Sequence, residues 1–489
     1  MKRLKKIPFF LLLLPLFFCL HGAVENYGYL HLTEVLEVGL LIAGCMAFLF
    51  FIIQLFARDY IFASLVVFFI SLWYLFFGAF HDWITTTAFL SFLKSYTVLF
   101  LLLPALTILW ALFLKRNRQL YGKLLLYINL LMLIYCSIDG FLLLKNMLSA
   151  SEKNTAGMIA FDNAKVQQKP DVYYIVLDEY PGFKSLQDSF GFANEKFQDW
   201  LGANSFKVLP VFSNYDLTYF SMSSILNMNY VKDNFENLQL TQQDFQKRGV
   251  EIDNAAVVSI FQSMGYRLEN LSIFDIAGKP ALSAKNSFLL AHSILLTDKM
   301  LHNRMKKDIG KGLGKLLPFW KNKDFYYHDA DNKETERKLV STAAEKKQEP
   351  VFVYAHFMMP HGPYYYDSSG NKNPFDKISN YTKWKDKTLF VSYLKYINNR
   401  VQHILSDIIS NDPGAVIVLM GDHGYREYDN KGLDQPYRYD NLCAVRFPRN
   451  NHISFKDNWS NVNLFRYIFN CEFGQQIPYL PDSSVILRY

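Results

Sequence analysis

Hydrophobic residues follow two different patterns, and the change between them falls near residue 150. Before that point apolar residues form long, almost uninterrupted runs, and after it they form short runs between polar stretches. The long runs predict five membrane spans, at residues 7–20, 35–56, 60–80, 92–114 and 124–144. The last four are long enough to cross a bilayer as a helix, which takes roughly 20 residues. We therefore expect residues 1–148 to form a helical transmembrane domain.

The first run is shorter than the others and follows four basic residues, Lys2, Arg3, Lys5 and Lys6. A basic leader before a short apolar stretch is also typical of a secretory signal peptide. Cleavage would then fall near residues 21–23, where His-Gly-Ala is a poor small-residue site. We favour an uncleaved first span, and a cleaved signal peptide is the alternative.

Basic residues occur only in alternate connections between the predicted spans. Connections 22–34 and 81–91 contain no Lys or Arg. The other two connections contain Arg58, Lys115, Arg116, Arg118 and Lys123. Since basic connections stay in the cytoplasm, this pattern places the amino terminus inside and everything after residue 144 outside. The expected location is therefore the cytoplasmic (inner) membrane, with a large extracytoplasmic, or periplasmic, domain.

The basic residues of the leader and the inner connections account for the net charge of +7. Nine Lys and Arg residues lie in the leader and the inner connections, so removing them leaves −2 for the rest. No basic surplus remains outside to attract a polyanion, which excludes nucleic acid as a partner.

Asp139 lies inside the last predicted span, where an ionisable residue is costly and often functional. In a structural role, Asp139 caps a neighbouring helix or reaches the membrane–water interface. In a functional role, it contacts a cationic lipid headgroup. Residues 149–170 follow, and their polar, patternless sequence predicts a linker.

From residue 171 onward, short apolar runs alternate with helical patterns. Strands are predicted at 172–177, 206–209, 351–357 and 415–420, and helices at 194–203, 254–264, 334–347 and 389–409. This alternation is typical of βαβ units, so we expect residues 171–489 to form one α/β domain with a mainly parallel sheet. Residues 299–331 are predicted to form an insertion or a surface loop. Cys443 and Cys471 form a disulfide or remain free thiols.

The most informative stretch is residues 415–424, AVIVLMGDHG. Its apolar run predicts a buried strand, and Asp422 and His423 follow it directly. Open α/β sheets bind ligands outside the carboxyl ends of their strands, and a carboxylate beside an imidazole suits a divalent cation. The alternative is a turn in which the aspartate only caps the backbone.

Three further stretches supply residues of the same kind. Asp178 ends another predicted strand, in DVYYIVLDEY. Thr218 stands where a helix over 219–227 would begin, so it is either an N-cap or a hydroxyl nucleophile near the positive end of the helix dipole. His361 follows a strand that contains His356 and lies in Pro-His-Gly-Pro, as a structural histidine or as a donor to a phosphoryl oxygen or leaving group.

Together these residues predict metal-assisted covalent transfer at phosphorus or sulfur. One divalent ion would be held by Asp178, Thr218, Asp422 and His423. Thr218 would be the nucleophile, and His361 would stabilise the oxyanion. A mixed carboxylate and imidazole set favours Zn or Mn over Mg or Ca.

These motifs resemble the alkaline phosphatase/sulfatase superfamily, in particular its membrane-anchored branch of lipoteichoic acid synthases and lipid A phosphoethanolamine transferases. The resemblance rests on Asp178 at a strand end, Thr-x-x-Ser at 218–221, His-Gly-Pro at 361–363 and Gly-Asp-His-Gly at 421–424, in the family's order. It covers nearly all of the outer domain, and the preceding spans match that architecture. The resemblance implies a sulfatase-like fold, a threonine nucleophile, and Zn or Mn as the metal.

The sequence also departs from other branches of that superfamily. Nothing around Thr218 matches the Cys/Ser-x-Pro-x-Arg motif of true sulfatases, and no Asp-x-x-x-His can be placed for a two-metal phosphatase. Glu179 stands where many relatives have glycine, and we predict that Asp178 rather than Glu179 binds the ion. Four residues remain candidates for contacts with the substrate: His356, Glu179, Arg426 and Asp139.

The predicted function is transfer of a phospholipid-derived headgroup, phosphoethanolamine or phosphoglycerol, through a phosphothreonine intermediate. The expected partners are a membrane phospholipid donor and an envelope glycan or lipid acceptor, and the sequence leaves the oligomeric state open. Two alternatives remain: a membrane-tethered phosphodiesterase or sulfatase-like hydrolase, and a catalytically silent envelope protein.

Overall fold

The computed structural model contains two compact units. The first comprises Met1–Ala156 and Ser287–Asn322, and the second comprises Gly157–Asn286 and Lys323–Tyr489. The structure describes residues 4–27, 30, 32–87, 89, 93, 95–150, 160–231, 240, 242–282, 293–308, 327–379, 387–426, 436–449, 453, 459–485 and 487.

The first unit is helical. Its helices are α1 (Phe10–Glu25), α2 (Leu32–Ala57), α3 (Tyr60–Leu75), α4 (Phe77–Thr86), α5 (Tyr96–Arg116), α6 (Tyr121–Ala150), α12 (Ile294–Thr297) and α13 (Leu301–Asp308). Three stretches, α2, α5 and the one from Arg118 to Leu148, are long and apolar enough to cross a membrane. The pair α3 and α4, bent by 59°, forms a fourth span if it is counted as one. The sequence predicted five spans, but α1 has only 16 residues and falls short of this length.

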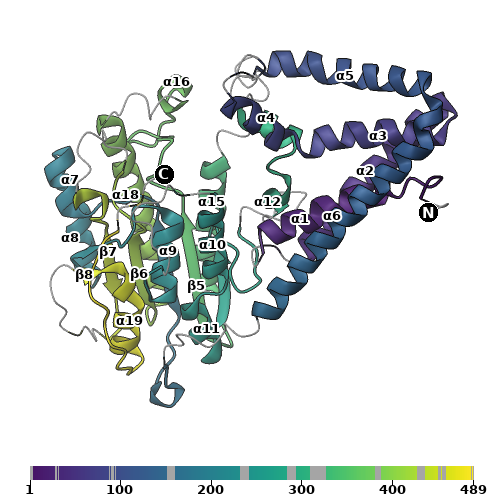
Figure 1. Ribbon diagram of the computed structural model, residues 1–489. Coiled ribbons are helices and arrows are strands. Elements are labelled where there is room, and N and C mark those ends of the chain that lie inside the picture. Colours follow the sequence, from purple (N-terminus) through teal and green to yellow (C-terminus); the bar gives the residue numbers. More distant parts are fainter. Residues whose placement is uncertain are drawn as a thin grey trace. The chain divides into compact units, whose positions relative to one another are not determined.

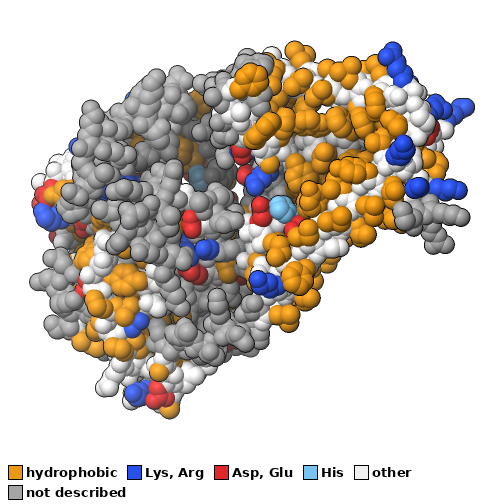
Figure 2. All heavy atoms as spheres, in the orientation of Figure 1, with side chains coloured by type: hydrophobic (Ala, Val, Ile, Leu, Met, Phe, Trp, Pro, Cys, Tyr) orange, Lys and Arg blue, Asp and Glu red, His pale blue; other side chains and the backbone are white. Residues whose placement is uncertain are grey.

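Side chains on the surface of this unit match a membrane environment. Figure 2 shows hydrophobic side chains spread over its helices, and exposed examples include Leu40, Phe56 and Leu101. Lys and Arg side chains gather at the end where the amino terminus and the α2–α3 and α5–α6 connections lie (Figures 1 and 2). The three basic segments thus lie at one end of the unit, and their location on the cytoplasmic side stays a prediction.

The start of α1 is held by a buried amide from α6. Asn129 accepts a hydrogen bond from the backbone N–H of Phe10 at 2.8 Å, and its Nδ2 donates to the carbonyls of Leu4 and Ile7. These contacts satisfy backbone groups that a helix end leaves unpaired. Phe10 and Leu14 are fully buried in the core of the unit.

Helices α12 and α13 come from the stretch between the strands of the second unit, yet they pack on the membrane helices. Leu296 and Met300 join the apolar core of the first unit. The backbone N–H of Gly78 donates to the Lys299 carbonyl at 2.6 Å, and a Cβ on Gly78 would lie 2.8 Å from Lys299. The predicted insertion at 299–331 therefore begins as part of the helical unit, and its residues 309–326 lie outside the described residues.

The second unit is built on a six-stranded sheet of order β2-β7-β6-β1-β5-β4. The strands are β1 (Val172–Leu177), β2 (Lys207–Val208), β4 (Arg267–Leu271), β5 (Val351–Phe357), β6 (Val416–Gly421) and β7 (Cys443–Arg446). The four strands β6, β1, β5 and β4 are parallel, whereas β7 and β2 are antiparallel to their neighbours. The expected mainly parallel sheet is thus confirmed. A separate pair, β3 (Val211–Phe212) and β8 (Trp459–Ser460), is also parallel.

Helices cover both faces of the sheet, which explains why its central strands are apolar throughout. Every residue of β1, β5 and β6 is buried. Tyr174 and Val418 pack into one apolar core and Tyr173 and Ile417 into another, as the two-residue period of a strand requires. The first core contains α9 (Thr218–Asn227), α11 (Ala256–Ser263) and α19 (Leu464–Glu472), and the second contains α8 (Glu195–Ala203), α15 (Tyr327–Ala344) and α18 (Lys387–Asn411).

The remaining helices of this unit are short. They are α7 (Phe183–Phe190), α10 (Gln242–Asp253), α16 (Phe375–Ser379), and the 3₁₀ turns at Asn163–Lys165, Pro436–Arg438 and Asn461–Asn463. All four predicted strands and all four predicted helices are present. The strands at 172–177 and 351–357 have the predicted ends, and the other elements have shifted ends. Cys443 and Cys471 are free thiols.

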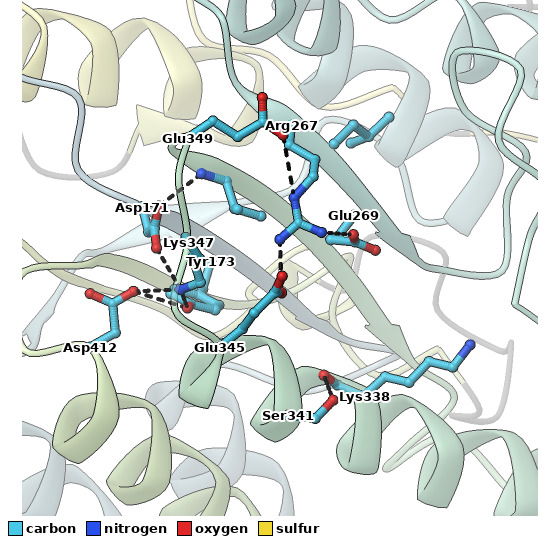
Figure 3. A network of polar contacts seen from close by, with 12 residues as sticks. Asp171, Tyr173, Arg267, Glu269, Lys338, Ser341, Glu345, Lys347, Glu349 and Asp412 are labelled. Atoms are coloured by element: carbon cyan, nitrogen blue, oxygen red, sulfur yellow. Dashed lines mark hydrogen bonds and ion pairs between the residues drawn. The ribbon is translucent and has the colours of Figure 1, made fainter.

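A charged network ties together the amino ends of the three central strands (Figure 3). Lys347 donates to Asp171 at 2.5 Å, to Asp412 at 3.0 Å and to the Tyr173 hydroxyl at 2.7 Å. Asp171 in turn accepts from the backbone N–H of Val351 at 2.8 Å. Asp171 precedes β1, Val351 begins β5 and Asp412 precedes β6, so one ammonium group holds the three strand starts in register.

We expect Lys347→Met to lower the free energy of unfolding by about 2–4 kcal/mol, because it leaves two largely buried carboxylates without their cation. The side chains of Lys347, Asp171 and Asp412 are only 10%, 12% and 18% exposed. Thermal unfolding of the full-length protein in detergent measures the loss. Arg337→Met is the control, since Arg337 is 65% exposed and pairs with Glu334 at the surface. Equal stability of the Lys347→Met variant and the wild type would show that the network contributes nothing.

Candidate active site

The predicted site residues meet at the carboxyl edge of the sheet. β1 lies between β5 and β6 in parallel register, so the segments that follow these three strands lie side by side. Asp178 and Glu179 follow β1, and Asp422 and His423 follow the end of β6. His356 lies within β5, and His361 lies four residues after its end.

Asp422 is fully buried, and its two carboxylate oxygens have different surroundings. Oδ1 accepts hydrogen bonds from the backbone N–H groups of Glu179 and His423, both at 2.9 Å. Oδ2 has no hydrogen-bond partner among the described residues. The backbone therefore fixes the carboxylate and leaves one oxygen directed into the site, as a metal ligand requires.

His423 is held in one tautomer. Its Nδ1 lies 2.7 Å from the Gly424 carbonyl, which can only accept, so Nδ1 carries the proton. Nε2 then presents its lone pair 3.3 Å from Asp422 Oδ2 and 3.4 Å from the hydroxyl of Thr218. His423 Nε2, Asp422 Oδ2 and the Thr218 hydroxyl oxygen therefore lie close together.

Thr218 is the first residue of α9, and the N-cap position belongs to Leu217. The threonine is thus not the N-cap that was the alternative, and no side-chain cap bond is made at this helix end. One turn on, the Ser221 hydroxyl donates to the Asp422 carbonyl at 2.5 Å. This bond joins the first turn of α9 to the end of β6 and sets the hydroxyl of Thr218 beside His423.

His356 lies deeper and is 2% exposed. Its Nδ1 is 2.9 Å from the Tyr354 hydroxyl, whereas its Nε2 has no hydrogen-bond partner and lies 3.8 Å from Asp178 Oδ2. Ligand atoms of Asp178, His356 and Asp422 all lie within 4.8 Å of one another. The structure thus brings His356, predicted as a substrate contact, into a group that could hold an ion.

The two consecutive acids after β1 point in different directions. Glu179 has a φ of +63°, which is unusual for a residue other than glycine and turns the chain sharply. Its Oε1 accepts from the backbone N–H of Arg426 at 2.9 Å, and its Oε2 lies 3.9 Å from Nε2 of His361. Both side chains are buried, with Asp178 beside His356 and Glu179 beside His361. That Asp178 rather than Glu179 binds the ion stays a prediction.

Opposite charges set the pKa values of two groups. Burial by itself would raise the pKa of the Asp178 carboxyl, but His356, His361 and His423 face it and lower the pKa overall. Burial would likewise lower the pKa of His361, and the carboxylates of Asp178 and Glu179 outweigh it and raise that pKa. The carboxylate and the imidazolium therefore favour each other's charged forms.

His361 is fixed by backbone contacts on both sides. Its N–H donates to the Asp178 carbonyl at 3.1 Å, and its Nδ1 donates to the Gly362 carbonyl at 2.7 Å. The imidazole is therefore oriented with Nε2 toward the carboxylates.

One further histidine lies near the site, and no sequence motif pointed to it. His328, in the first turn of α15, lies close enough to His361 and Asp178 to be affected by their charges. Burial and the charge of His361 lower its pKa to about 4, so it is neutral at pH 7. Its surroundings in the sequence are polar and carry no strand-end signal, which is why no pattern pointed to it.

Two other predicted contact residues have different positions. Arg426 lies beside Glu179, with Nε 3.8 Å from Oε1, and its Nη1 donates to the Asp216 carbonyl. Asp139 belongs to the first unit, where its carboxylate lies 3.2 Å from Nδ1 of His21.

The donor set fits a divalent cation. An ion with ligand bonds of about 2.0–2.1 Å in a tetrahedron separates its ligand atoms by roughly 3.3 Å. The spacings of His423 Nε2 from Asp422 Oδ2 and Thr218 Oγ1, 3.3 and 3.4 Å, match that value. Within the described part of the chain, buried oxygens of Asp178, Glu179 and Asp422 lack hydrogen-bond partners, and such groups are costly unless a cation or proton satisfies them.

Comparison with known proteins finds one family model and several similar structures. Residues 211–450 match the family model described as Sulfatase. No curated protein sequence matches the chain. Among solved structures, it is similar to the C-terminal periplasmic domain of EcEptC from Escherichia coli in complex with Zn, with a TM-score of 0.40 and 13% identity, over 65% of this chain and 85% of that one.

Two further similar structures are a phosphonate monoester hydrolase from Silicibacter pomeroyi and a glycosaminoglycan-metabolism protein from Bacteroides thetaiotaomicron. The first has a TM-score of 0.39 and 15% identity, over 65% of this chain and 75% of that one. The second has a TM-score of 0.39 and 14% identity, over 64% of this chain and 74% of that one. The outer part of this chain thus contains a domain that the Sulfatase family model matches, built on a mainly parallel sheet.

Proposed function

We propose that this protein is a membrane-anchored transferase that moves the phosphoryl headgroup of a phospholipid, phosphoethanolamine or phosphoglycerol, onto an envelope glycan or lipid. The observation that supports this most is the position of the Thr218 hydroxyl, 3.4 Å from the unprotonated Nε2 of His423 and at the start of α9. A hydroxyl so placed can lose its proton and attack an anionic centre near the helix amino end.

The transfer has two half-reactions. In the first, Thr218 Oγ1 forms a bond to phosphorus, the bond from phosphorus to the diacylglycerol oxygen breaks, and diacylglycerol leaves with a proton. In the second, an acceptor hydroxyl bonds to the same phosphorus, the bond to Thr218 breaks, and the threonine regains its proton. Two steps allow donor and acceptor to bind in turn at one site.

Asp178, Asp422 and His423, with Thr218, would hold one divalent ion, Zn or Mn in preference to Mg or Ca. Such an ion lowers the pKa of a hydroxyl beside it and offsets the charge of phosphoryl oxygens. The backbone N–H groups on Asp422 Oδ1 keep that carboxylate oriented without help from the substrate.

His361 would donate a hydrogen bond from Nε2 to a phosphoryl oxygen or to the departing oxygen. Its raised pKa favours the protonated, donating form. Arg426, His356 and Glu179 line the same edge and are proposed as neighbours of the substrate. Asp139, in the membrane unit, remains a proposed contact for a cationic headgroup.

We expect His361→Gln to slow transfer at least ~10²-fold, the usual size for a lost acid or oxyanion donor. The glutamine retains a hydrogen-bonding group of similar reach but cannot carry a proton. Headgroup transfer to a fluorescent acceptor lipid gives the rate. His403→Gln, at an exposed position of α18, should leave it unchanged. A His361→Gln rate within a few-fold of wild type would remove this residue from the mechanism.

The membrane orientation is proposed from the basic residues at one end of the first unit. A reporter enzyme that works only outside the cytoplasm should be active when fused after Tyr489 and silent when fused after Asn117. An inactive reporter after Tyr489 and an active one after Asn117 would show the opposite topology. The site would then lie on the other side of the membrane from an outer acceptor.

A single experiment separates the transferase from its alternatives. Wild-type protein is incubated with headgroup-labelled phospholipid and no acceptor, and the Thr218 peptide is examined by mass spectrometry. A transferase leaves a phospho-headgroup adduct that an added acceptor discharges faster. An adduct that water discharges equally fast with or without acceptor indicates a phosphodiesterase, and the absence of both adduct and turnover indicates a catalytically silent protein.

A further inference from the structure

A cavity of about 420 Å³ lies in the first unit, between the segment that precedes α1 and the start of α6. Lys5, Gln119 and Lys123 supply its polar lining. Lys5 and Lys123 are exposed, and Tyr127, which also lines the cavity, is 65% exposed, so the cavity opens to the surroundings of the unit. Its volume is in the range of pockets that bind small molecules.

Lys5 has a fixed backbone although it lies near the amino terminus. Asn129 of α6 donates hydrogen bonds to the carbonyl of Leu4 at 2.9 Å and to the carbonyl of Ile7 at 2.8 Å. The backbone on both sides of Lys5 is therefore held against α6. A side chain on such a backbone loses less freedom on binding a ligand than a lysine in a loose terminal segment does.

The charge around the cavity is positive. The leader and the segments around the α2–α3 and α5–α6 connections contain nine Lys and Arg but one acid, Asp59, and Lys and Arg side chains gather at this end of the unit (Figure 2). The Asp59 carboxylate accepts from the backbone N–H of Phe62 as the N-cap of α3. Among the described residues, neither Lys5 nor Lys123 forms an ion pair with a carboxylate. The two ammonium groups therefore favour an anionic ligand.

The rest of the lining is mainly apolar and continues along α6. Leu126, Tyr127 and Leu130 line the cavity. Lys123, Leu126 and Leu130 are three and four residues apart, so they lie on one face of the helix. A rise of 1.5 Å per residue places Leu130 roughly 10 Å along the helix axis from Lys123. Ile134, which is 54% exposed, extends this face further. A ligand that fits the whole surface has an anionic end and an apolar chain.

We propose that this cavity binds an anionic phospholipid, with its phosphate between Lys5 and Lys123 and an acyl chain along the face of α6 that carries Leu126 and Leu130. Basic pockets between membrane helices recognise anionic headgroups in this way. A zwitterionic lipid fits less well, because its ammonium group would lie beside two lysines. A free phosphate ion would leave the apolar face uncovered. In the orientation proposed above, the lipid belongs to the inner leaflet.

This inference depends on neither the transfer reaction nor its metal. The test titrates phosphatidic acid into full-length protein in detergent and counts bound lipids by native mass spectrometry. A chelator is present throughout, so that metal-dependent transfer cannot consume the lipid. Phosphatidylcholine is the zwitterionic comparison, and inorganic phosphate is added as a competitor. Phosphatidic acid with a photoactivatable acyl chain identifies the peptide that the lipid touches.

Wild type is expected to bind phosphatidic acid at least ~10-fold more tightly than phosphatidylcholine, and the photoactivatable lipid should label the peptide that contains Leu126 and Leu130. The double variant Lys5→Gln/Lys123→Gln should bind phosphatidic acid roughly 25-fold more weakly, about five-fold for each lysine. The matched control is Lys115→Gln/Arg116→Gln, which removes the same charge from the last turn of α5, outside the cavity lining. Binding by this control should weaken less than about 3-fold, since salt screens charges that do not contact the lipid.

Gly122→Leu tests the cavity without changing any charge. Gly122 lines the cavity, and a Cβ there would lie 3.7 Å from the carbonyl oxygen of Lys5, which is an ordinary contact. Leucine is also a better helix former than glycine, so the fold should survive, and circular dichroism verifies it. The larger side chain fills the space, so this variant should lose both the preference for phosphatidic acid and the label on α6.

The same affinity for phosphatidic acid in wild type, Lys5→Gln/Lys123→Gln and Gly122→Leu would overturn the inference. Equal affinity of wild type for phosphatidic acid and phosphatidylcholine would also contradict it. A lipid that inorganic phosphate displaces at millimolar concentration would indicate a phosphate site instead of a lipid site. A label found only after residue 156 would place the lipid outside this unit. None of these outcomes bears on headgroup transfer, which the adduct experiment tests separately.

Discussion

Thr218→Ala is expected to abolish headgroup transfer, with a loss of roughly 10³-fold or more, the scale of removing a covalent nucleophile. The fold should survive, because no side-chain cap bond is made at the start of α9 and alanine is a good helix former. Metal content should change little, since only one ligand of several is lost. Transfer to a labelled acceptor measures the rate, and the adduct on the Thr218 peptide should disappear.

Thr218→Ser is the matched variant. It keeps the hydroxyl at the start of the helix and should retain a substantial part of the rate, together with the covalent adduct. If Thr218→Ala transferred headgroups as fast as wild type, the covalent mechanism would be wrong. An ion in the site could then only be activating an acceptor or water directly.

Asp422→Asn is expected to remove the metal and, with it, at least ~10²-fold of the activity. The substitution is nearly isosteric. An asparagine Oδ1 can still accept from the backbone N–H groups of Glu179 and His423, as the carboxylate does at 2.9 Å. What changes is the buried Oδ2, which becomes an amide without negative charge and cannot ligate an ion.

Elemental analysis of the purified full-length variant gives the metal content, and thermal unfolding verifies the fold. Asp407→Asn, on the exposed side of α18, provides the control for a lost carboxylate. A variant Asp422→Asn with wild-type metal content and activity would show that the carboxylate is not a ligand. In that case Asp178, Thr218 and His423 would have to hold the ion without it.

The α/β fold was predictable because its strongest signals are local. β1, β5 and β6 are buried on both faces, so each reads as a largely apolar run, and polar residues follow β1 and β6 directly. The same property revealed Asp178, Asp422 and His423, since a residue that follows a buried parallel strand lies at the ligand-binding edge. β4 and β7 were missed, because RLENL and CAVR are short and partly polar.

The roles within the site depended on contacts that no pattern encodes. His356 reads as one polar residue inside a strand, and only the pairing of β5 with β1 brings it within 3.8 Å of Asp178. The direction of Glu179 follows from its left-handed backbone, and the proximity of His328 follows from the packing of α15.

The membrane unit divides in the same way between local and tertiary information. Its helices and the common location of its basic connections follow from composition, because a bilayer demands long apolar helices and retains positive charge inside. The 59° bend between α3 and α4, and the return of α12 and α13 to pack on these helices, were not encoded by any periodicity. The sequence by itself thus determined which segments form helices, buried strands and strand-end acids. Only the tertiary structure decided which of those side chains meet, because their contacts join residues more than a hundred positions apart.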